Sequence, residues 1–133
     1  MRSHRNLTVW QRASDVAESV YRLTGEFPRA EMFGLTAQMR RAAISVVSNI
    51  AEGAARGSDP EFRRFLDIAM GSAGELQAQL DISQRLGFGA PELFSLANNQ
   101  VDEVKRMLAS LKRTVQKRVN AKRSQIPDSL SDI

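Results

Sequence analysis

Residues Gly34 to Gly53 read GLTAQMRRAAISVVSNIAEG, and the spacing of the apolar side chains in this stretch decides the fold. At 100° per residue, one set falls within about 100° of arc, as the buried stripe of an amphipathic helix does. That set is Leu35, Met39, Ala42, Ala43, Val46 and Ile50. The spacing predicts a helix from about Leu35 to Ala55, closed by Gly53 and Gly57.

The segments on either side of this stretch repeat the helical period. Residues 7–27 carry apolar side chains in steps of three and four, and Gly25 and Pro28 follow as stop signals. A third helix is predicted from the sequence Ser58-Asp59-Pro60-Glu61, which matches a capping box with Ser58 as N-cap. Alternatively, Asp59 is the N-cap and Pro60 the first helical residue.

A fourth helix is predicted to start at Pro91 and carries the most regular pattern. Its apolar residues alternate in steps of three and four over three heptads, which is typical of near-antiparallel, left-handed helix packing. The residues are Phe94, Ala97, Val101, Val104, Leu108, Leu111 and Val115. The third and fourth helices are expected to be the longest, at about 28 residues each, or about 42 Å.

Short connections of about three to eight residues force consecutive helices to run antiparallel. The sequence therefore predicts an all-α, up-and-down antiparallel four-helix bundle. We expect residues 1–6 to form an N-terminal arm, residues 7–123 the bundle, and residues 124–133 a flexible C-terminal tail, since the tail is polar, contains Pro127 and shows no period.

The composition excludes most catalytic chemistry. The chain has 133 residues, no cysteine and one histidine, His4, so disulfides, zinc fingers, thiol catalysis and most serine–histidine triads are ruled out. The run from Gly71 to Glu75 is not a nucleophile motif, and the Glu-x-x-His pairs of a di-iron bundle are missing. We therefore expect no enzyme activity, no cofactor and no metal site. Without a signal peptide or a membrane-spanning run, we expect a cytoplasmic protein with no membrane partner.

The formal charge of +4 is unevenly distributed. Residues 105–123 hold eight basic and no acidic side chains, whereas the remaining residues hold 11 basic and 15 acidic ones, a balance of −4. This excess predicts a phosphate contact with RNA or DNA, of weak sequence specificity because no aromatic residue is interleaved. The alternative is a solvated helix end that suits the helix dipole. The predicted nucleic-acid-binding residues are Lys105, Arg106, Lys112, Arg113, Lys117, Arg118, Lys122 and Arg123.

Two polar stripes suggest a subunit interface. One lies on the second predicted helix (Arg41, Ser45, Ser48, Asn49 and Glu52), and the other on the third (Ile68, Ser72, Glu75, Gln79, Ile82 and Leu86). The second mixes aliphatic and uncharged polar side chains, unlike a plain solvated face. A satisfied polar network within a monomer is the alternative. Gly71 and Gly74 lie mid-helix at a cost of about 1 kcal/mol each, which predicts the close approach of a second helix, from the same chain or a second subunit.

The stretch from Gly34 to Gly53 resembles the signature of the bacterial 23S rRNA-intervening sequence protein family, as do Leu7-Thr8-Val9-Trp10, Phe27-Pro28 and the run from Gly71 to Leu76. The resemblance implies an up-and-down bundle that assembles into a closed ring, with five subunits known in the family. It also implies a relation to retroelement accessory variability proteins and no established enzymatic activity. The motif positions that carry over, as structural or interface residues, are Arg40, Arg41, Asn49, Glu52, Gly53, Ser72 and Glu75.

Two functional hypotheses follow. The first is a non-catalytic homo-oligomer that binds nucleic acid through the basic C-terminal helix. The second is a protein–protein scaffold or accessory subunit that presents the basic helix ends to an acidic protein partner. The two differ in whether RNA or DNA binds to the purified protein.

Overall fold

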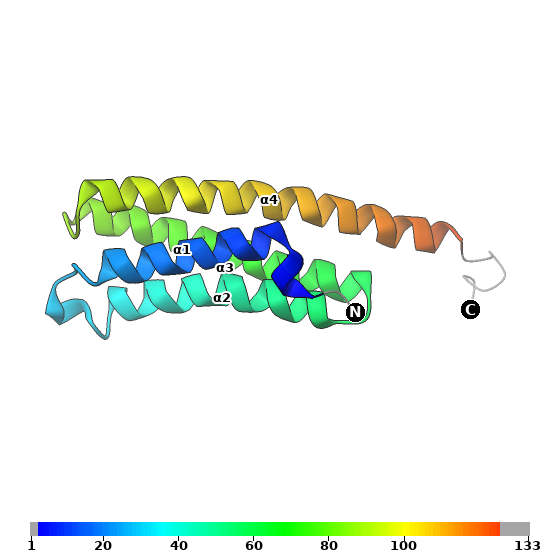
Figure 1. The fold of residues 1–133 in the computed structure, drawn as a ribbon, viewed down its shortest axis with the longest axis horizontal. Helices are drawn as coiled ribbons and strands as arrows, with labels where there is room; N and C mark the ends of the chain where they lie inside the picture. The colour runs from blue at the N-terminus through cyan, green and yellow to red at the C-terminus, as the bar shows by residue number, and fades with distance from the viewer. Residues whose placement is uncertain (1–2, 126–133) are drawn as a thin grey trace.

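The computed structural model describes residues 3–125, which form four long helices and two short 3-10 turns. The long helices are α1 (Thr8–Thr24), α2 (Leu35–Ala55), α3 (Asp59–Arg85) and α4 (Pro91–Ser124) (Figure 1). The 3-10 turns are η1 (His4–Asn6) and η2 (Arg29–Glu31). The predicted C-terminal tail lies, from residue 126 onward, outside the described residues.

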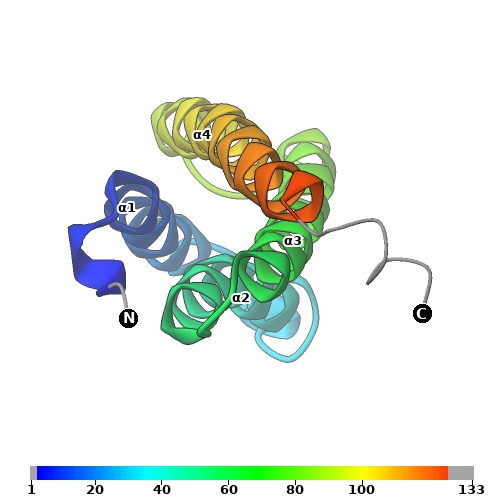
Figure 2. The same cartoon turned by 90° about the vertical axis from the view of Figure 1, so that its right-hand side faces the viewer.

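Each long helix packs against its neighbours in sequence, and α1 also packs against α4. The end view in Figure 2 shows the four helices at the corners of one bundle. This arrangement is all-α and agrees with the predicted up-and-down order. In the described part of the chain, no helix is both long enough and apolar enough to cross a membrane.

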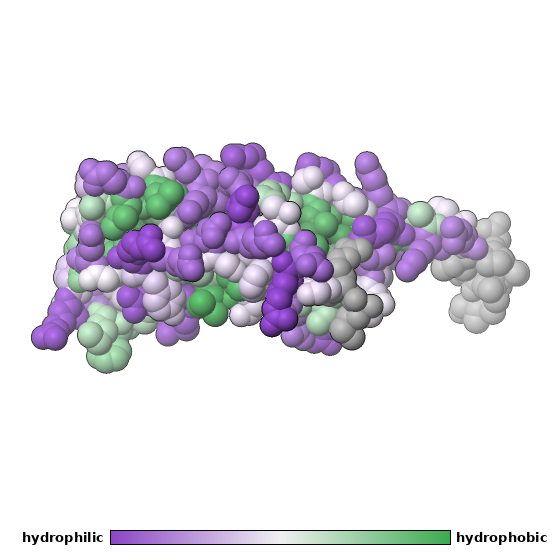
Figure 3. Space-filling view, in the orientation of Figure 1, coloured by the Kyte–Doolittle hydropathy of each residue, from purple (hydrophilic) through white to green (hydrophobic). Residues whose placement is uncertain are grey.

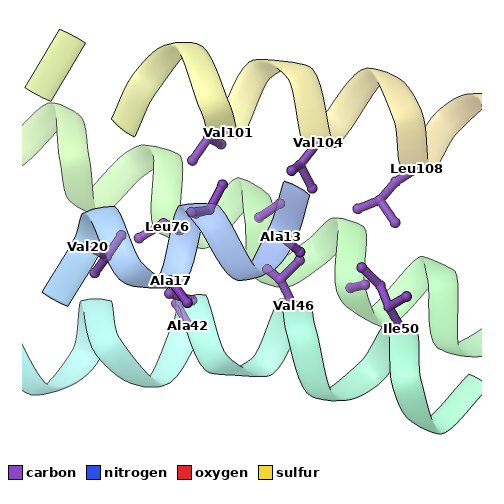
Figure 4. Packing of buried hydrophobic residues seen from close by; sticks show 14 of the residues in the cluster. Ala13, Ala17, Val20, Ala42, Val46, Ile50, Leu76, Val101, Val104 and Leu108 are labelled. Carbon is purple, nitrogen blue, oxygen red and sulfur yellow. The ribbon is translucent and has the colours of Figure 1, made fainter. Parts of the chain in front are cut away.

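The core runs the length of the bundle and is built from the predicted stripes. Figure 4 shows Val101, Val104 and Leu108 of α4 pointing towards the side chains of the other helices. Leu108 is fully buried, as are Ile50 of α2 and Leu76 of α3. Of the predicted heptad residues only Leu111 lies at the margin of the core, where it is partly buried.

The start of α3 follows the first of the two capping predictions. The Ser58 side chain accepts a hydrogen bond from the Glu61 backbone N–H at 3.4 Å, so Ser58 is the N-cap and Pro60 is the second helical residue. The alternative, with Asp59 as the cap, is wrong. The Glu61 carboxylate turns outward to Arg64, 3.2 Å away, rather than back to the cap.

Two lengths differ from the sequence-based expectation. The connection between α1 and α2 spans residues 25–34 and includes η2, because Pro28 and Gly34 hold non-helical backbone on both sides of that short turn. Helix α4 has 34 residues, against 27 in α3, so its C-terminal part extends beyond the bundle, as Figure 1 shows. We call the last six residues of α4, 119–124, the overhang; Val119, Lys122 and Arg123 still share a groove with the first turn of α3.

The glycine predictions need correcting. Gly53 does not close α2 but lies inside it, where an added Cβ would stand 2.8 Å from the Phe65 Cβ and 3.0 Å from the Phe62 Cδ1. The close helix–helix approach is therefore at Gly53, between α2 and α3. At Gly71 and Gly74 an added Cβ would meet nothing within 4 Å, so neither residue is needed for packing within the described chain.

Candidate nucleic-acid interface

The eight basic residues predicted to bind nucleic acid all lie on α4, between Lys105 and Arg123, but the structure divides them into two rows. Side chains of the inner row reach α3 and find acceptors there. Side chains of the outer row are exposed, with no hydrogen-bond or ion-pair partner among residues 3–125. The inner row is Lys105, Lys112, Arg118 and Lys122, and the outer row is Arg106, Arg113, Lys117 and Arg123.

The first two inner-row residues hold α4 against the side of α3. The Lys105 ammonium donates to the Gln77 Oε1 at 2.7 Å, and the Lys112 ammonium contacts the Asp67 carboxylate at 2.6 Å. Lys105 and Lys112 are therefore engaged with α3 and do not share the outward side with the outer row. Their positions on the helical wheel border the core, close enough to α3 for a long side chain to bridge.

The other two inner-row residues converge on Asp59, at the start of α3. Arg118 donates through Nε and Nη2 to the two carboxylate oxygens at 3.3 and 3.2 Å, and the Lys122 Nζ lies 3.9 Å from the same carboxylate. The Asp59 side chain keeps only 19% of its exposed surface, against 71% for Lys122. These contacts hold the C-terminal part of α4 against the start of α3.

Three of the four outer-row residues lie on one outward side of α4, and Arg123 lies on the overhang, about 100° round the helix from them. Arg106, Arg113 and Lys117 are seven and four residues apart, which places them within about 40° of each other on the wheel. In Figure 3 the projecting end of α4 is mostly hydrophilic. A row of unpaired cations on one helix face is the electrostatic footprint of a phosphate-binding surface.

One further cation joins this surface, and the sequence analysis missed it. Arg63 of α3 lines an open groove of about 300 Å³ together with Lys122 and Arg123 of α4. The groove also contains Pro60 and Val119. Arg63 belongs to a segment with balanced charge, so only the crossing of α3 and α4 brings it to the basic end.

The two predicted polar stripes meet along the outer seam between α2 and α3. The Ser45 and Ser72 hydroxyls are 2.8 Å apart, and the Asn49 side-chain amide donates to the Ser45 carbonyl and hydroxyl oxygens at 2.8 and 3.0 Å. Arg41 and Glu75 line a shallow polar depression beside this pair. The seam is therefore in part a polar network within one chain, which was the alternative to a subunit interface.

The seam also contains one buried polar atom without a hydrogen-bond partner among residues 3–125, and several exposed apolar side chains. The Gln79 amide nitrogen donates to Glu75 at 3.2 Å, but the buried Gln79 Oε1 has no partner among residues 3–125. Ile68 and Ile82 are 40% and 51% exposed, and Gly71 faces open space. A helix face with exposed aliphatic residues around a polar centre has the composition of a contact surface.

Of the other motif residues, Arg40 and Gly53 hold α2 against its neighbours, whereas Glu52 lies on the surface. The Arg40 guanidinium lies over the Tyr21 ring, 4.5 Å from its centroid, and donates to the Thr24 hydroxyl at 2.9 Å, so it joins α2 to α1. Glu52 pairs with Arg56 one turn later at 2.8 Å, on the surface. Gly53 allows the close packing against α3 described above. These residues are therefore spread over two sides of α2.

The most exposed large apolar residue in the described chain was not anticipated. Phe33, in the connection between α1 and α2, is 91% exposed, and the adjacent Met32 is 50% exposed. In the sequence these two side chains stand in the loop just before the family signature and match no helical period. A protruding aromatic side chain of this kind is typical of a protein-contact site.

Comparisons with known proteins agree with this architecture. Residues 5–110 match the family model described as 23S rRNA-intervening sequence protein. A solved structure from Bacteroides thetaiotaomicron, described as a protein of unknown function from the S23 ribosomal protein family, is 24% identical and superimposes with a TM-score of 0.72. That match covers 79% of this chain and 95% of the other. No curated protein matches the sequence.

Proposed function

This chain belongs to the family of 23S rRNA-intervening sequence proteins, and from that premise we propose that it is a non-catalytic, oligomeric protein that binds RNA or DNA phosphates. The observation that carries the proposal is the outer row of α4. Four cations without a partner in the described chain stand on one exposed helix and its overhang, while Asp59 and Asp67 of α3 pair with inner-row cations.

The chemistry of the outer row fits a phosphate backbone rather than base recognition. Three of the four side chains are arginines, whose planar guanidinium groups bind phosphate oxygens in pairs. The α4 segment from 105 to 123 has no aromatic side chain on which a base could stack. Binding is therefore expected to be weakly sequence-specific and to fall steeply with salt.

Oligomerisation through the seam between α2 and α3 is the second part of the proposal. The exposed Ile68 and Ile82 and the open surface at Gly71 support a second copy as the seam's partner, in the closed ring of five that the family resemblance implies. A ring would repeat the outer row around its rim, and simultaneous contacts would raise the avidity for a long nucleic acid.

The seam predicts the effect of single substitutions on assembly. Ile82→Asp places a charge, and Gly71→Arg a long cationic side chain, into the proposed contact, so we expect each to weaken self-association at least tenfold, or by about 1.4 kcal/mol. Light-scattering mass across a dilution series measures this. Leu96→Asp is the matched control, since Leu96 is 43% exposed on α4, outside the seam. An unchanged mass for both seam variants would exclude the seam as the interface.

The alternative function is a scaffold that presents the basic end to an acidic protein. Phe33 favours a protein contact in addition to any nucleic acid, because a 91% exposed phenyl ring is an efficient anchor for a pocket on another protein. Phe33 lies in the α1–α2 connection, whereas the outer row lies on α4. Phe33→Ala is therefore expected to leave nucleic-acid binding unchanged even if it abolishes a protein contact.

One chromatographic run tests the proposal as a whole. The full chain is passed over a sizing column with light scattering and absorbance at 260 and 280 nm, before and after nuclease treatment. We expect a mass that is a multiple of the 14.8 kDa chain, with excess absorbance at 260 nm that nuclease removes. A monomeric mass, a protein-only spectrum and no binding of added single-stranded RNA would refute it.

A further inference from the structure

The inner row contains an ion pair with a consequence for binding, and this inference rests on the proposed phosphate-binding function. We propose that Asp59 is an internal competitor for phosphate: its carboxylate withholds Arg118 and Lys122 from a nucleic acid and so limits how many cations of α4 take part in binding.

The geometry of the contact supports this assignment. Arg118 meets Asp59 through two parallel hydrogen bonds of 3.2 and 3.3 Å, which is the arrangement in which a guanidinium also binds two phosphate oxygens. The Lys122 ammonium, 3.9 Å from the same carboxylate, supplies the second positive charge. A carboxylate between two cations thus occupies the position that a backbone phosphate would take.

The contact of Arg118 and Lys122 with Asp59 is exposed enough for a phosphate to replace the Asp59 carboxylate. Arg118 keeps 36% and Lys122 71% of its side-chain exposure, so solvent and an incoming phosphate can reach both. Asp59 is the less exposed partner, at 19%, and stays in place as the first residue of α3. Lys122 shares a groove with Arg123 of the outer row, so a strand bound at Arg123 passes beside the pair. Exchange of Asp59 for phosphate would then recruit two cations.

The competition predicts opposite effects on nucleic-acid affinity and on the stability of the fold. Removing a charge that helps to hold α4 in place should strengthen nucleic-acid binding while weakening the fold. Removing Arg118, by contrast, should cost little affinity as long as Asp59 is present, because the side chain is already engaged. The two substitutions should therefore be coupled, and a double-mutant cycle measures that coupling directly.

The experiment compares Asp59→Asn, Arg118→Gln and the double variant in the full chain, by titration with a single-stranded RNA of fixed length. We expect Asp59→Asn to bind about three- to tenfold more tightly, with a log–log salt slope steeper by about 1.4, at roughly 0.7 for each of two added phosphate contacts. Arg118→Gln alone should change affinity less than twofold, and in the Asp59→Asn background it should remove at least half of the gain.

The matched control is Asp81→Asn, which changes the net charge equally. Asp81 is exposed and lies 22 residues along α3 from Asp59, about 33 Å at the standard helical rise. If Asp81→Asn raises the affinity as much as Asp59→Asn, or if the Asp59→Asn gain is the same with and without Arg118, the inference is wrong and the effect is one of net charge.

A probe other than nucleic acid separates this inference from the proposed function. Inorganic tripolyphosphate, titrated calorimetrically, should bind Asp59→Asn at least threefold more tightly than the unsubstituted chain, in a manner that depends on Arg118. If no variant binds RNA but this dependence holds, the proposed function fails and the competition stands. If tripolyphosphate binds all variants equally, or none of them, the competition fails.

Discussion

Gly53→Ala is expected to destabilise the protein by about 2 kcal/mol, although glycine-to-alanine changes inside helices are normally stabilising. The new Cβ would stand 2.8 Å from the Phe65 Cβ and 3.0 Å from the Phe62 ring. The first of these atoms is attached to the α3 backbone, so relief requires the two helices to move apart. Thermal unfolding should show a midpoint lower by about 6–10 °C.

Gly74→Ala is the control for this prediction. It makes the same chemical change inside α3, at a position where an added Cβ meets nothing within 4 Å. We expect Gly74→Ala to be neutral or to stabilise by up to about 1 kcal/mol. A Gly53→Ala variant as stable as Gly74→Ala would show that α2 and α3 do not approach as closely as described.

Arg113→Glu combined with Lys117→Glu is expected to weaken single-stranded RNA binding about 100-fold at low salt. Both side chains belong to the outer row, and reversal of their charge converts two phosphate contacts into two repulsions. The fold should be unaffected, because neither side chain has a partner among residues 3–125. Equilibrium titration gives the affinity, and circular dichroism gives the helix content.

The control reverses two arginines with the same net charge change at a different place. Arg22 and Arg29 are exposed and lie at the end of α1 and in η2, near the N-terminal end of α4 and far along that helix from Arg113 and Lys117. Arg22→Glu with Arg29→Glu should weaken binding only through the overall charge, by less than about fivefold. Equal losses for the two double variants would mean that binding follows net charge and that the outer row is not a site.

The sequence predicts the helices well because helical period and stop signals are local. The bounds of α2, from Leu35 to Ala55, and the start of α4 at Pro91 are as expected, since apolar spacing, glycine and proline act on their own segment. The residues of α4 that are buried in the core also follow from its heptad pattern. The family signature lies in α2 and adds the relation to known bundles.

The candidate site is less predictable, because it depends on which helices meet. The excess of cations on α4 is visible in the sequence, but its division into two rows is not, since Asp59, Asp67 and Gln77 lie on another helix. The helical wheel places Lys112 at the border of the core, but only the contact between α3 and α4 shows that its side chain reaches Asp67. The sequence predicts a stop role for Gly53 for the same reason, because its close approach to Phe65 is a tertiary contact without a local signal.

The most direct test of the outer row is the salt dependence of RNA binding by the full chain. With four outer-row cations and about 0.7 ions released per phosphate on a single strand, we expect a slope of log affinity against log salt of about −3 for each bound subunit. Neutralising two outer-row residues, as in Arg113→Gln with Lys117→Gln, should make it shallower by about 1.4. A slope that is unchanged in that variant, or no binding of RNA even at low salt, would contradict the account.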